Sequence, residues 1–200
     1  YIADGYQNKR VAVLDADTGK YKRHWGAYGN KPDDADLGKY DPKAPPSKQF
    51  RNPVHCVERT NDGLVYVCDR ANNRVQVFNP DGSFVKEAVY AKETLGSGSA
   101  WDIAFSKDPQ QRFKMMVYDF KKGIALHASP DGIHWNAEIV RYPQTGDRST
   151  FFYNPFRERW VFSIRSSSKR GRSRDYWETK DFFSFTPEVS EKRQSRSEEH

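Results

Sequence analysis

The sequence predicts an all-β protein, and three observations carry this prediction. Aromatic residues make up 14% of the 200-residue chain, and such side chains favour the half-buried surface of a sheet. Short alternating apolar runs recur between turns rich in Gly, Asn and Asp, without the 3.6-residue periodicity of a helix. The mean hydropathy of −0.95 and the lack of an apolar run of about 18 residues exclude a membrane-spanning helix.

An internal repeat defines the first elements. The pattern YIAD…NKRVAVL at residues 1–4 and 8–14 recurs as YVCD…NNRVQVF at residues 66–69 and 72–78. Each copy predicts two strands joined by an Asn-rich turn, followed by an Asp/Gly hairpin turn into a third strand. Residues 53–58 add a fourth strand before the second copy. Four short antiparallel strands per repeat are typical of a propeller blade.

The two copies are further apart than the about 40–45 residues of an ordinary blade. The surplus lies in residues 28–50, which are rich in Asp, Lys and Pro. This composition predicts a long loop on one face of the blades.

The second half predicts further strands of a different character. Residues 98–105 open the next unit, and the pattern changes near Phe113. Strands are expected at 115–118, 123–128, 151–153, 160–165 and 176–185, with a turn and a strand following residue 129. The polar tail, residues 188–200, lacks aromatic residues and is expected to be disordered.

The net charge of +6 bears mainly on solubility. Nucleic-acid binding calls for a basic stripe, and one dense basic stretch is present. It consists of Arg165, Lys169, Arg170, Arg172 and Arg174. Its Ser/Gly setting predicts a solvated loop, so no nucleic-acid partner is expected.

The two cysteines, Cys56 and Cys68, lie in one hairpin-like stretch. They either face each other across two strands and oxidise, or remain buried thiols, and two cysteines do not decide the redox compartment. The chain begins at Tyr1 without a signal peptide, which we interpret as a fragment or a processed product.

A family resemblance emerges from four motifs taken in order. Residues 4–10 (DGYQNKR), 25–26 (WG), 53–55 (PVH) and 68–74 (CDRANNR) follow each other as in NHL-repeat propellers. Residues 1–112 resemble the peptidyl-α-hydroxyglycine amidating lyases and their bacterial relatives. The resemblance implies a six-bladed propeller with a zinc ion held by histidines near its axis. It also implies cleavage of a C-terminal α-hydroxyglycine to a peptide amide and glyoxylate.

Three residues match functional positions of that family. The resemblance makes Tyr6 the catalytic tyrosine, His55 a zinc ligand and Arg70 the active-site arginine, a cation suited to the substrate carboxylate. Other interpretations stay open: Tyr6 as a turn aromatic, His55 as a hydrogen-bonded strand histidine, and Arg70 as a partner of Asp4 or Asp69, which themselves suit turn formation.

The match to the lyases is incomplete at the metal. The family takes histidines from three blades, and the position that resembles the next histidine is Trp101. His24 lies next to Trp25 and could be recruited, but no motif supports it. Zinc is the cofactor that the resemblance implies, and calcium is a second candidate without a motif.

Residues 114–187 resemble the blades of five-bladed glycoside hydrolases of the invertase and arabinanase type. The motifs are at residues 123–135, 146–153, 159–162 and 174–182. Such enzymes use carboxylates on inner strands of different blades as nucleophile or base and as acid. The resemblance makes Asp147, Asp175 and Glu178 the candidates, although each also suits a surface or turn acid, and the nucleophile-bearing first blade has no counterpart.

We therefore predict an all-β chain of about four four-stranded antiparallel blades, forming a partial or hybrid propeller. Residues 1–113 supply NHL-type blades, residues 114–187 supply glycosidase-like blades, and the tail follows. A natural recombinant, an engineered chimera and a mis-assembled gene all fit the join near residue 113.

The expected function is that of a lyase-like, zinc-assisted propeller with an incomplete site. The alternatives are a non-catalytic scaffold that binds protein or carbohydrate, and a glycoside hydrolase-like remnant. Peptide or carbohydrate ligands, a homo-oligomer formed through open blade faces, and a secreted or periplasmic location complete the expectations.

Overall fold

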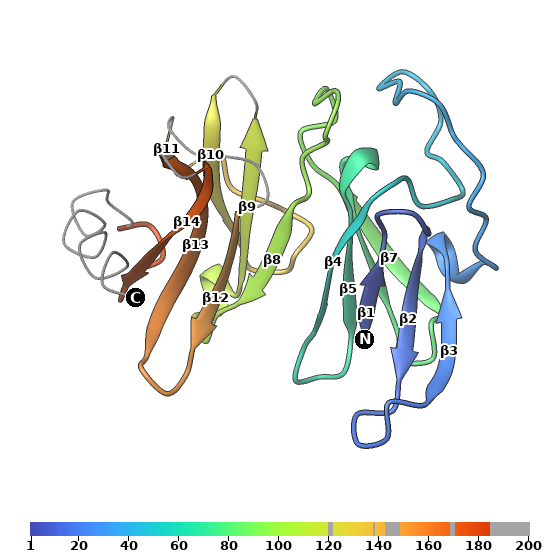
Figure 1. Ribbon diagram of the computed structural model, residues 1–200, viewed down its shortest axis with the longest axis horizontal. Coiled ribbons are helices and arrows are strands. Elements are labelled where there is room, and N and C mark those ends of the chain that lie inside the picture. The colour runs from blue at the N-terminus through green and yellow to red at the C-terminus, as the bar shows by residue number, and fades with distance from the viewer. Residues whose placement is uncertain (120–121, 138, 143–148, 169–170, 185–200) are drawn as a thin grey trace.

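The computed structural model describes residues 1–119, 122–137, 139–142, 149–168 and 171–184, and these form four antiparallel sheets (Figure 1). The first sheet is β1 (Ile2–Asp4), β2 (Arg10–Leu14) and β3 (Tyr21–Trp25). The second is β4 (Val54–Arg59), β5 (Val65–Asp69), β6 (Arg74–Phe78) and β7 (Phe84–Val89). The third is β8 (Asp102–Phe105), β9 (Phe113–Asp119), β10 (Gly123–Ser129) and β11 (Val140–Tyr142). The fourth is β12 (Thr150–Asn154), β13 (Arg159–Ser168) and β14 (Gly171–Thr179).

Helical structure in these residues is limited to three short 3-10 turns. They are η1 (Ala27–Gly29), η2 (Arg70–Asn72) and η3 (Pro109–Gln111). In the described part of the chain, no helix has the length and apolar character needed to cross a membrane.

The four sheets stack face to face in chain order, each with its own hydrophobic core against the next (Figure 1). Val11 and Val13 pack with Val65 and Phe78 between the first and second sheets. The second and third sheets share a core that includes Tyr66, Val77, Ile103 and Phe113. The third and fourth share Met116, Leu126, Phe151 and Phe162.

The strand that opens each sheet lies on the same side of the stack. β4 contacts β8, and β8 contacts β12. Sheets that pack face to face through apolar cores, with their first strands next to one another, form a partial β-propeller. The predicted all-β propeller of about four blades is confirmed, with three strands described in the first and fourth sheets.

The repeat produces the same cross-strand pair in two sheets. Asp4 lies opposite Arg10 across β1 and β2, and Asp69 lies opposite Arg74 across β5 and β6. The Arg74 Nε donates to Asp69 at 2.7 Å, and both side chains are buried. Asn73 follows η2 with φ of 55°, a left-handed conformation that Asn tolerates in turns.

The long loop of residues 28–50 is fastened to both copies of the repeat. Asp34 accepts hydrogen bonds from the Lys9 backbone N–H at 2.8 Å and from the Arg10 guanidinium. Near the other end of the loop, the Gln49 carbonyl accepts a bond from Arg74 at 3.1 Å. The loop is thus anchored at both ends by side chains of the repeat.

Cys56 and Cys68 form a disulfide, which decides between the two interpretations of the sequence. They lie opposite each other across β4 and β5, with a Cα–Cα distance of 4.8 Å. The bond crosses the inner edge of the second sheet.

Two predictions in the fourth sheet are wrong. The basic stretch is predicted to be a solvated loop, but Arg165 lies within β13, and Arg172 and Arg174 lie within β14, while Lys169 and Arg170 lie outside the described residues. The last strand spans Gly171–Thr179 and shares only residues 176–179 with the predicted range 176–185, whose final residue lies outside the described ones. The reason is that the apolar contacts of Ile164 and Trp177 fix the hairpin, and the polar residues beyond them continue its main-chain ladder.

The third sheet contains the point near residue 113 at which the sequence pattern changes. β8 precedes that point and β9 begins at Phe113, and the two strands pair from Asp102 opposite Met116 to Phe105 opposite Phe113. The predicted junction therefore falls inside one sheet. The predicted tail, residues 188–200, lies outside the described residues.

Candidate functional site

Tyr6, His55 and Arg70 lie close together, although three separate segments supply them. Tyr6 is in the loop between β1 and β2, His55 is on β4, and Arg70 begins η2 directly after β5. The Arg70 Nη1 lies 3.4 Å from the Tyr6 hydroxyl, a long hydrogen bond. The Tyr6 and His55 ring centroids are 6.1 Å apart.

Trp101 packs against both His55 and Arg70. The Arg70 guanidinium carbon lies 4.2 Å from the Trp101 ring centroid, in the range of a strong cation–π contact. The His55 ring meets the same indole edge to face at 5.1 Å, and the His55 Nδ1 donates to the Trp101 carbonyl at 2.5 Å. A carbonyl only accepts, so Nδ1 carries the proton in the neutral ring and Nε2 carries the lone pair.

The site opens towards solvent at Tyr6. The Tyr6 side chain is 54% exposed, whereas Arg70 is 9% and Trp101 is 2% exposed. Gly98, with φ of 76°, packs directly on this group, because a Cβ at Gly98 would lie 1.9 Å from the Arg70 carbonyl oxygen. The segment before Trp101 is therefore pressed against the turn that carries Arg70.

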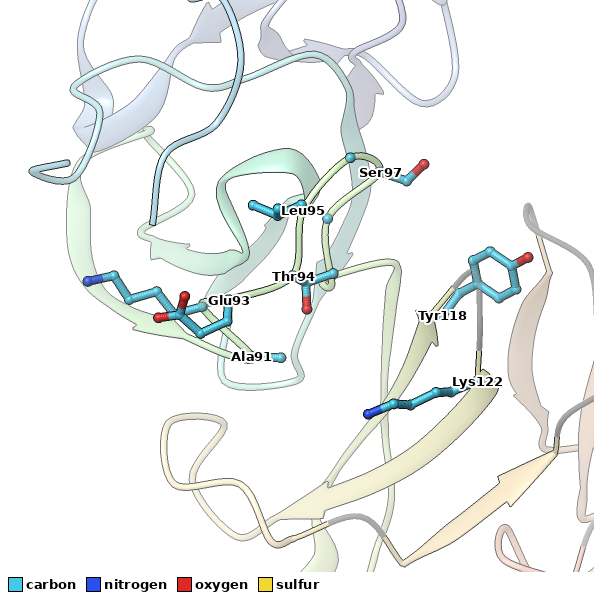
Figure 2. Close-up of a pocket in the computed structure, with 10 residues that line it drawn as sticks. Ala91, Glu93, Thr94, Leu95, Ser97, Tyr118 and Lys122 are labelled. Atoms are coloured by element: carbon cyan, nitrogen blue, oxygen red, sulfur yellow. The ribbon is translucent and has the colours of Figure 1, made fainter. Parts of the chain in front are cut away.

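A hollow of about 630 Å³ adjoins the site (Figure 2). One wall is the connection of residues 91–98 between β7 and β8. The other consists of Tyr118, near the end of β9, and Lys122, directly before β10. Tyr118 meets the Trp101 indole edge to face at 5.3 Å, which links the hollow to the site.

Asn73 holds the first wall of the hollow in place. Its Nδ2 donates to the carbonyls of Lys92 at 3.2 Å and Thr94 at 2.9 Å, and its Oδ1 accepts from the Ser99 N–H at 2.8 Å. These bonds tie the connection of residues 91–98 to the turn that follows η2.

The carboxylates of Asp4 and Asp69 accept hydrogen bonds at the turns of their own hairpins. Asp69 accepts hydrogen bonds from Arg74, from Asn72 at 2.8 Å and from the Arg51 N–H at 3.0 Å. Complete burial nevertheless raises the pKa of Asp69 above its ordinary value. Asp4 accepts from Asn8 at 2.7 Å. The arginine that Asp69 pairs with is Arg74, the repeat arginine.

The donor set does not fit the zinc site that the resemblance implies. Within the described ranges, no three His, Cys, Asp or Glu side chains are grouped so that they could hold a metal ion. His24 lies away from His55, on β3, where its Nδ1 is 2.7 Å from the Tyr21 hydroxyl. The indole of Trp101 fills the space beside His55, where a zinc site would need a metal-binding side chain.

The glycosidase candidates are not brought together. Asp175 and Glu178 both lie on β14, three positions apart, and therefore point to opposite faces of the sheet. Asp175 accepts from Ser166 at 2.9 Å, and Glu178 pairs with Arg157 at 2.6 Å. Asp147 lies outside the described residues.

Two features of this region escaped the sequence reasoning. The hollow depends on contacts between distant segments, which no local motif reports. Asp102 lies on β8, where its carboxylate accepts from the Phe151 N–H of β12 at 3.3 Å. Burial, together with the nearby charge of Glu58, raises the pKa of Asp102 to about 7. The sequence feature that could have pointed to Asp102 is an acidic residue between Trp101 and Ile103 in an otherwise apolar strand.

Comparison with known families supports the propeller. Residues 54–78 match the family model described as NHL repeat, which covers β4 to β6 and includes His55 and Arg70. No curated protein is similar enough to count as a match.

Proposed function

We propose that this propeller scaffold binds a peptide, whose C-terminal carboxylate lies against Arg70 and Tyr6. The observation that carries the proposal is the Arg70 guanidinium, stacked 4.2 Å from the Trp101 ring and 3.4 Å from the exposed Tyr6 hydroxyl. A guanidinium fork binds a carboxylate through two parallel hydrogen bonds, and the indole beneath it fixes the plane of the fork.

The neighbouring hollow supports a peptide rather than a small free anion as ligand. Its volume of about 630 Å³ lies within the range of about 300–1,000 Å³ that is typical of ligand sites. Tyr118 and Leu95 offer apolar surface there, and the Lys122 ammonium offers a charge. The hollow lies beside Arg70, because Tyr118 in its lining contacts the Trp101 ring on which the Arg70 guanidinium stacks.

The test compares pentapeptides with a free C-terminal carboxylate and the same peptides as C-terminal amides, by titration calorimetry. We expect the carboxylate forms to bind at least about tenfold tighter, a difference of about 1.4 kcal/mol. Arg70→Met should remove this preference, and Arg70→Lys should weaken it because Lys lacks the fork. Arg112→Gln, which removes a half-buried arginine between β8 and β9, is the control.

Equal affinities for the two peptide forms would contradict the carboxylate assignment. Binding that survives Arg70→Met unchanged in a folded variant would contradict the site itself.

A second candidate function is a lyase-like cleavage. The observation that favours it is the meeting of Tyr6, His55 and Arg70, the three residues that the family resemblance singled out. In that reaction the proton of the substrate hydroxyl would pass by way of Tyr6 to the departing amide nitrogen, as the C–N bond breaks and the C=O bond of glyoxylate forms, while Arg70 holds the carboxylate. Because the described donors do not fit a three-histidine zinc site, we assign no step to a metal.

Glyoxylate release from a peptidyl-α-hydroxyglycine tests this second candidate, with and without added zinc. Release that Tyr6→Phe abolishes would support it, and zinc content should fall in His55→Ala if His55 is a ligand. If well-folded protein releases no glyoxylate, the lyase candidate is ruled out and peptide binding remains as the proposed function.

We also propose that the protein works in an oxidising location, outside the cytoplasm. The Cys56–Cys68 disulfide supports this, since such bonds persist mainly in oxidising compartments. Mass spectrometry of thiol-alkylated protein, taken directly from its source cells, tests the proposal: alkylated cysteines would contradict it.

Oligomer formation through the outer blade faces is a further proposal. Ile2, Leu14 and Tyr21 in the first sheet and Phe152 in the fourth are exposed apolar side chains. Sedimentation equilibrium tests this, and a monomer at all concentrations would contradict it.

A further inference from the structure

We propose that the long loop carries a docking surface for a second protein, whose groove is lined with aromatic side chains and has acidic residues at its rim. The surface is the segment of residues 41–46, which contains Pro42, Pro45 and Pro46. It shares no residue with the Arg70 site or the hollow beside it, and the inference does not depend on the proposed peptide ligand.

The length of the loop indicates a role beyond joining two blades. The connection from β3 to β4 spans residues 26–53, whereas the connection from β7 to β8 spans residues 90–101. Residues 26–53 are all described, and apart from η1 they form neither helix nor strand. Connections longer than about 12–15 residues without secondary structure are uncommon in compact domains and usually serve a function. The additional residues are therefore candidates for a binding surface.

The prolines lie between two fixed points of the loop, which projects beyond the strand ends of the first and second sheets (Figure 1). On one side, the Tyr40 hydroxyl donates to the Lys92 carbonyl at 3.0 Å. On the other side, the Gln49 carbonyl accepts from Arg74 at 3.1 Å. Residues 43–46 lie between these points, are exposed and belong to none of the hydrophobic cores. The segment is therefore held at both ends and presented to solvent.

Local hydrogen bonds and proline restrict the backbone of the segment. The Lys43 N–H donates to the Asp41 carboxylate at 2.9 Å, and the Ala44 N–H donates to the Asp41 carbonyl at 3.2 Å. The second bond closes a β-turn with Pro42 at its second position, where proline is favoured. Ala44 and Pro45 each precede a proline, which disfavours helical backbone and favours the polyproline II region. Little conformational freedom is left to lose on binding.

The chemistry of Pro45 and Pro46 indicates what kind of groove fits them. Proline has no backbone N–H, so the pair offers carbonyl acceptors and the apolar surface of two rings. Grooves lined with aromatic side chains bind such segments and exploit their preformed backbone. Tyr and Trp suit this groove, since they combine a flat apolar ring with an O–H or N–H donor for the carbonyls.

The charges beside the prolines indicate the rim of the groove. Lys39 and Lys43 are both exposed. The carboxylate between them, on Asp41, accepts from the Lys43 N–H and is the one acidic group of residues 39–46. The surface is therefore net positive. Because complementary charge speeds association and selects the partner, acidic residues at the rim fit this surface.

The test titrates the full 200-residue chain against a fluorescently labelled WW domain and a labelled SH3 domain, each with acidic residues beside its aromatic groove, by anisotropy. We expect saturable binding of at least one domain with a Kd of about 10 μM to 1 mM. Neutralising the acidic rim of that domain should weaken binding at least about threefold. Replacing the tryptophan in its groove by alanine should abolish binding.

Variants of the chain locate the surface. The double variant Pro45→Ala/Pro46→Ala should weaken binding at least about tenfold, because it removes the apolar rings and frees the backbone. Lys43→Gln should weaken binding about twofold or more. Pro80→Ala is the matched control and should change nothing, since Pro80 is also exposed but lies in the tight turn between β6 and β7.

Several results would overturn the inference. These are no saturable binding of either domain up to about 1 mM, equal binding by the domain without its groove tryptophan, or the same loss in Pro80→Ala as in the double variant. An affinity that is unchanged when the acidic rim is neutralised would overturn the assigned charge of the partner. Circular dichroism and melting temperature establish that each variant is folded. Titration with the carboxylate peptide tests the Arg70 site separately, and the double variant should leave it unchanged.

Discussion

Replacing Asp102 by Asn should make the protein less sensitive to alkaline pH. The Asp102 carboxylate lies between the third and fourth sheets and accepts from the Phe151 N–H and, at 3.0 Å, from the Ile103 N–H. Burial, reinforced by the charge of Glu58 on β4, raises the pKa of Asp102 from 3.8 to about 7.

The sign follows from the raised pKa. The folded state binds the proton more tightly than the unfolded state, so the contribution to stability is complete below pH 3.8 and is lost as the pH rises through 7. Between pH 5 and pH 8.5 the folded state has two pH units in which it retains a proton that the unfolded state has lost. At 1.36 kcal/mol per unit, the loss is at most about 2.7 kcal/mol.

The assay is urea unfolding followed by tryptophan fluorescence, for the wild type and Asp102→Asn at pH 5 and pH 8.5. The free energy of unfolding of Asp102→Asn, taken relative to the wild type, should increase by about 1–2.7 kcal/mol from pH 5 to pH 8.5. Asp17→Asn, at an exposed turn position, is the control and should show no such shift. A difference that is constant within about 0.5 kcal/mol would refute the reasoning.

Three further predictions concern the framework around the site. Arg74→Met should lower the free energy of unfolding by about 3–5 kcal/mol, because a buried carboxylate loses its partner; a loss below about 1 kcal/mol in denaturant unfolding would contradict the role of the pair. Reduction of the Cys56–Cys68 disulfide should cost about 2–4 kcal/mol, and an unchanged melting temperature after confirmed reduction would count against this. Gly98→Ala should displace the Arg70 turn and impair peptide binding, whereas Gly19→Ala, also at positive φ but with open space around its Cβ and in the turn between β2 and β3, should leave binding intact; equal binding in calorimetry would disprove the difference.

The repeat elements could be predicted because their signals are local. Alternating apolar residues, the Asn-rich turn and the Asp/Gly turn together determine each hairpin, and both copies of the pattern form the expected strands. The opposed pair of Asp69 and Arg74 follows from the same register. Such features depend on residues that are close to each other in the sequence, within a single hairpin.

The basic hairpin could not be predicted in the same way. Its outer half has Ser and Arg at most positions, which give no apolar alternation, and it extends a ladder that begins at Trp160 opposite Thr179. Ladder extension depends on main-chain pairing rather than on side-chain preference. A prediction that follows apolar residues therefore ends the first strand of this hairpin too early and begins the second too late.

The three candidate residues could be named from the sequence, but the structure around them could not. Tyr6, His55 and Arg70 were named from motifs, yet the role of Trp101 as a platform for the guanidinium required the packing of β8 against β4. The hollow combines residues 91–98 with Tyr118 and Lys122, whose proximity is a property of the fold alone.

The anchoring of the long loop has a consequence for how this surface can change. Asp34 and Gln49 are bound to the two repeat arginines, Arg10 and Arg74, which already serve the blades. The span between them can exchange residues without disturbing the sheets, since its ends are set by the framework and most of its side chains face water. New surface chemistry can thus arise here by mutation at little cost to folding, as it does in the variable loops of other β-scaffolds.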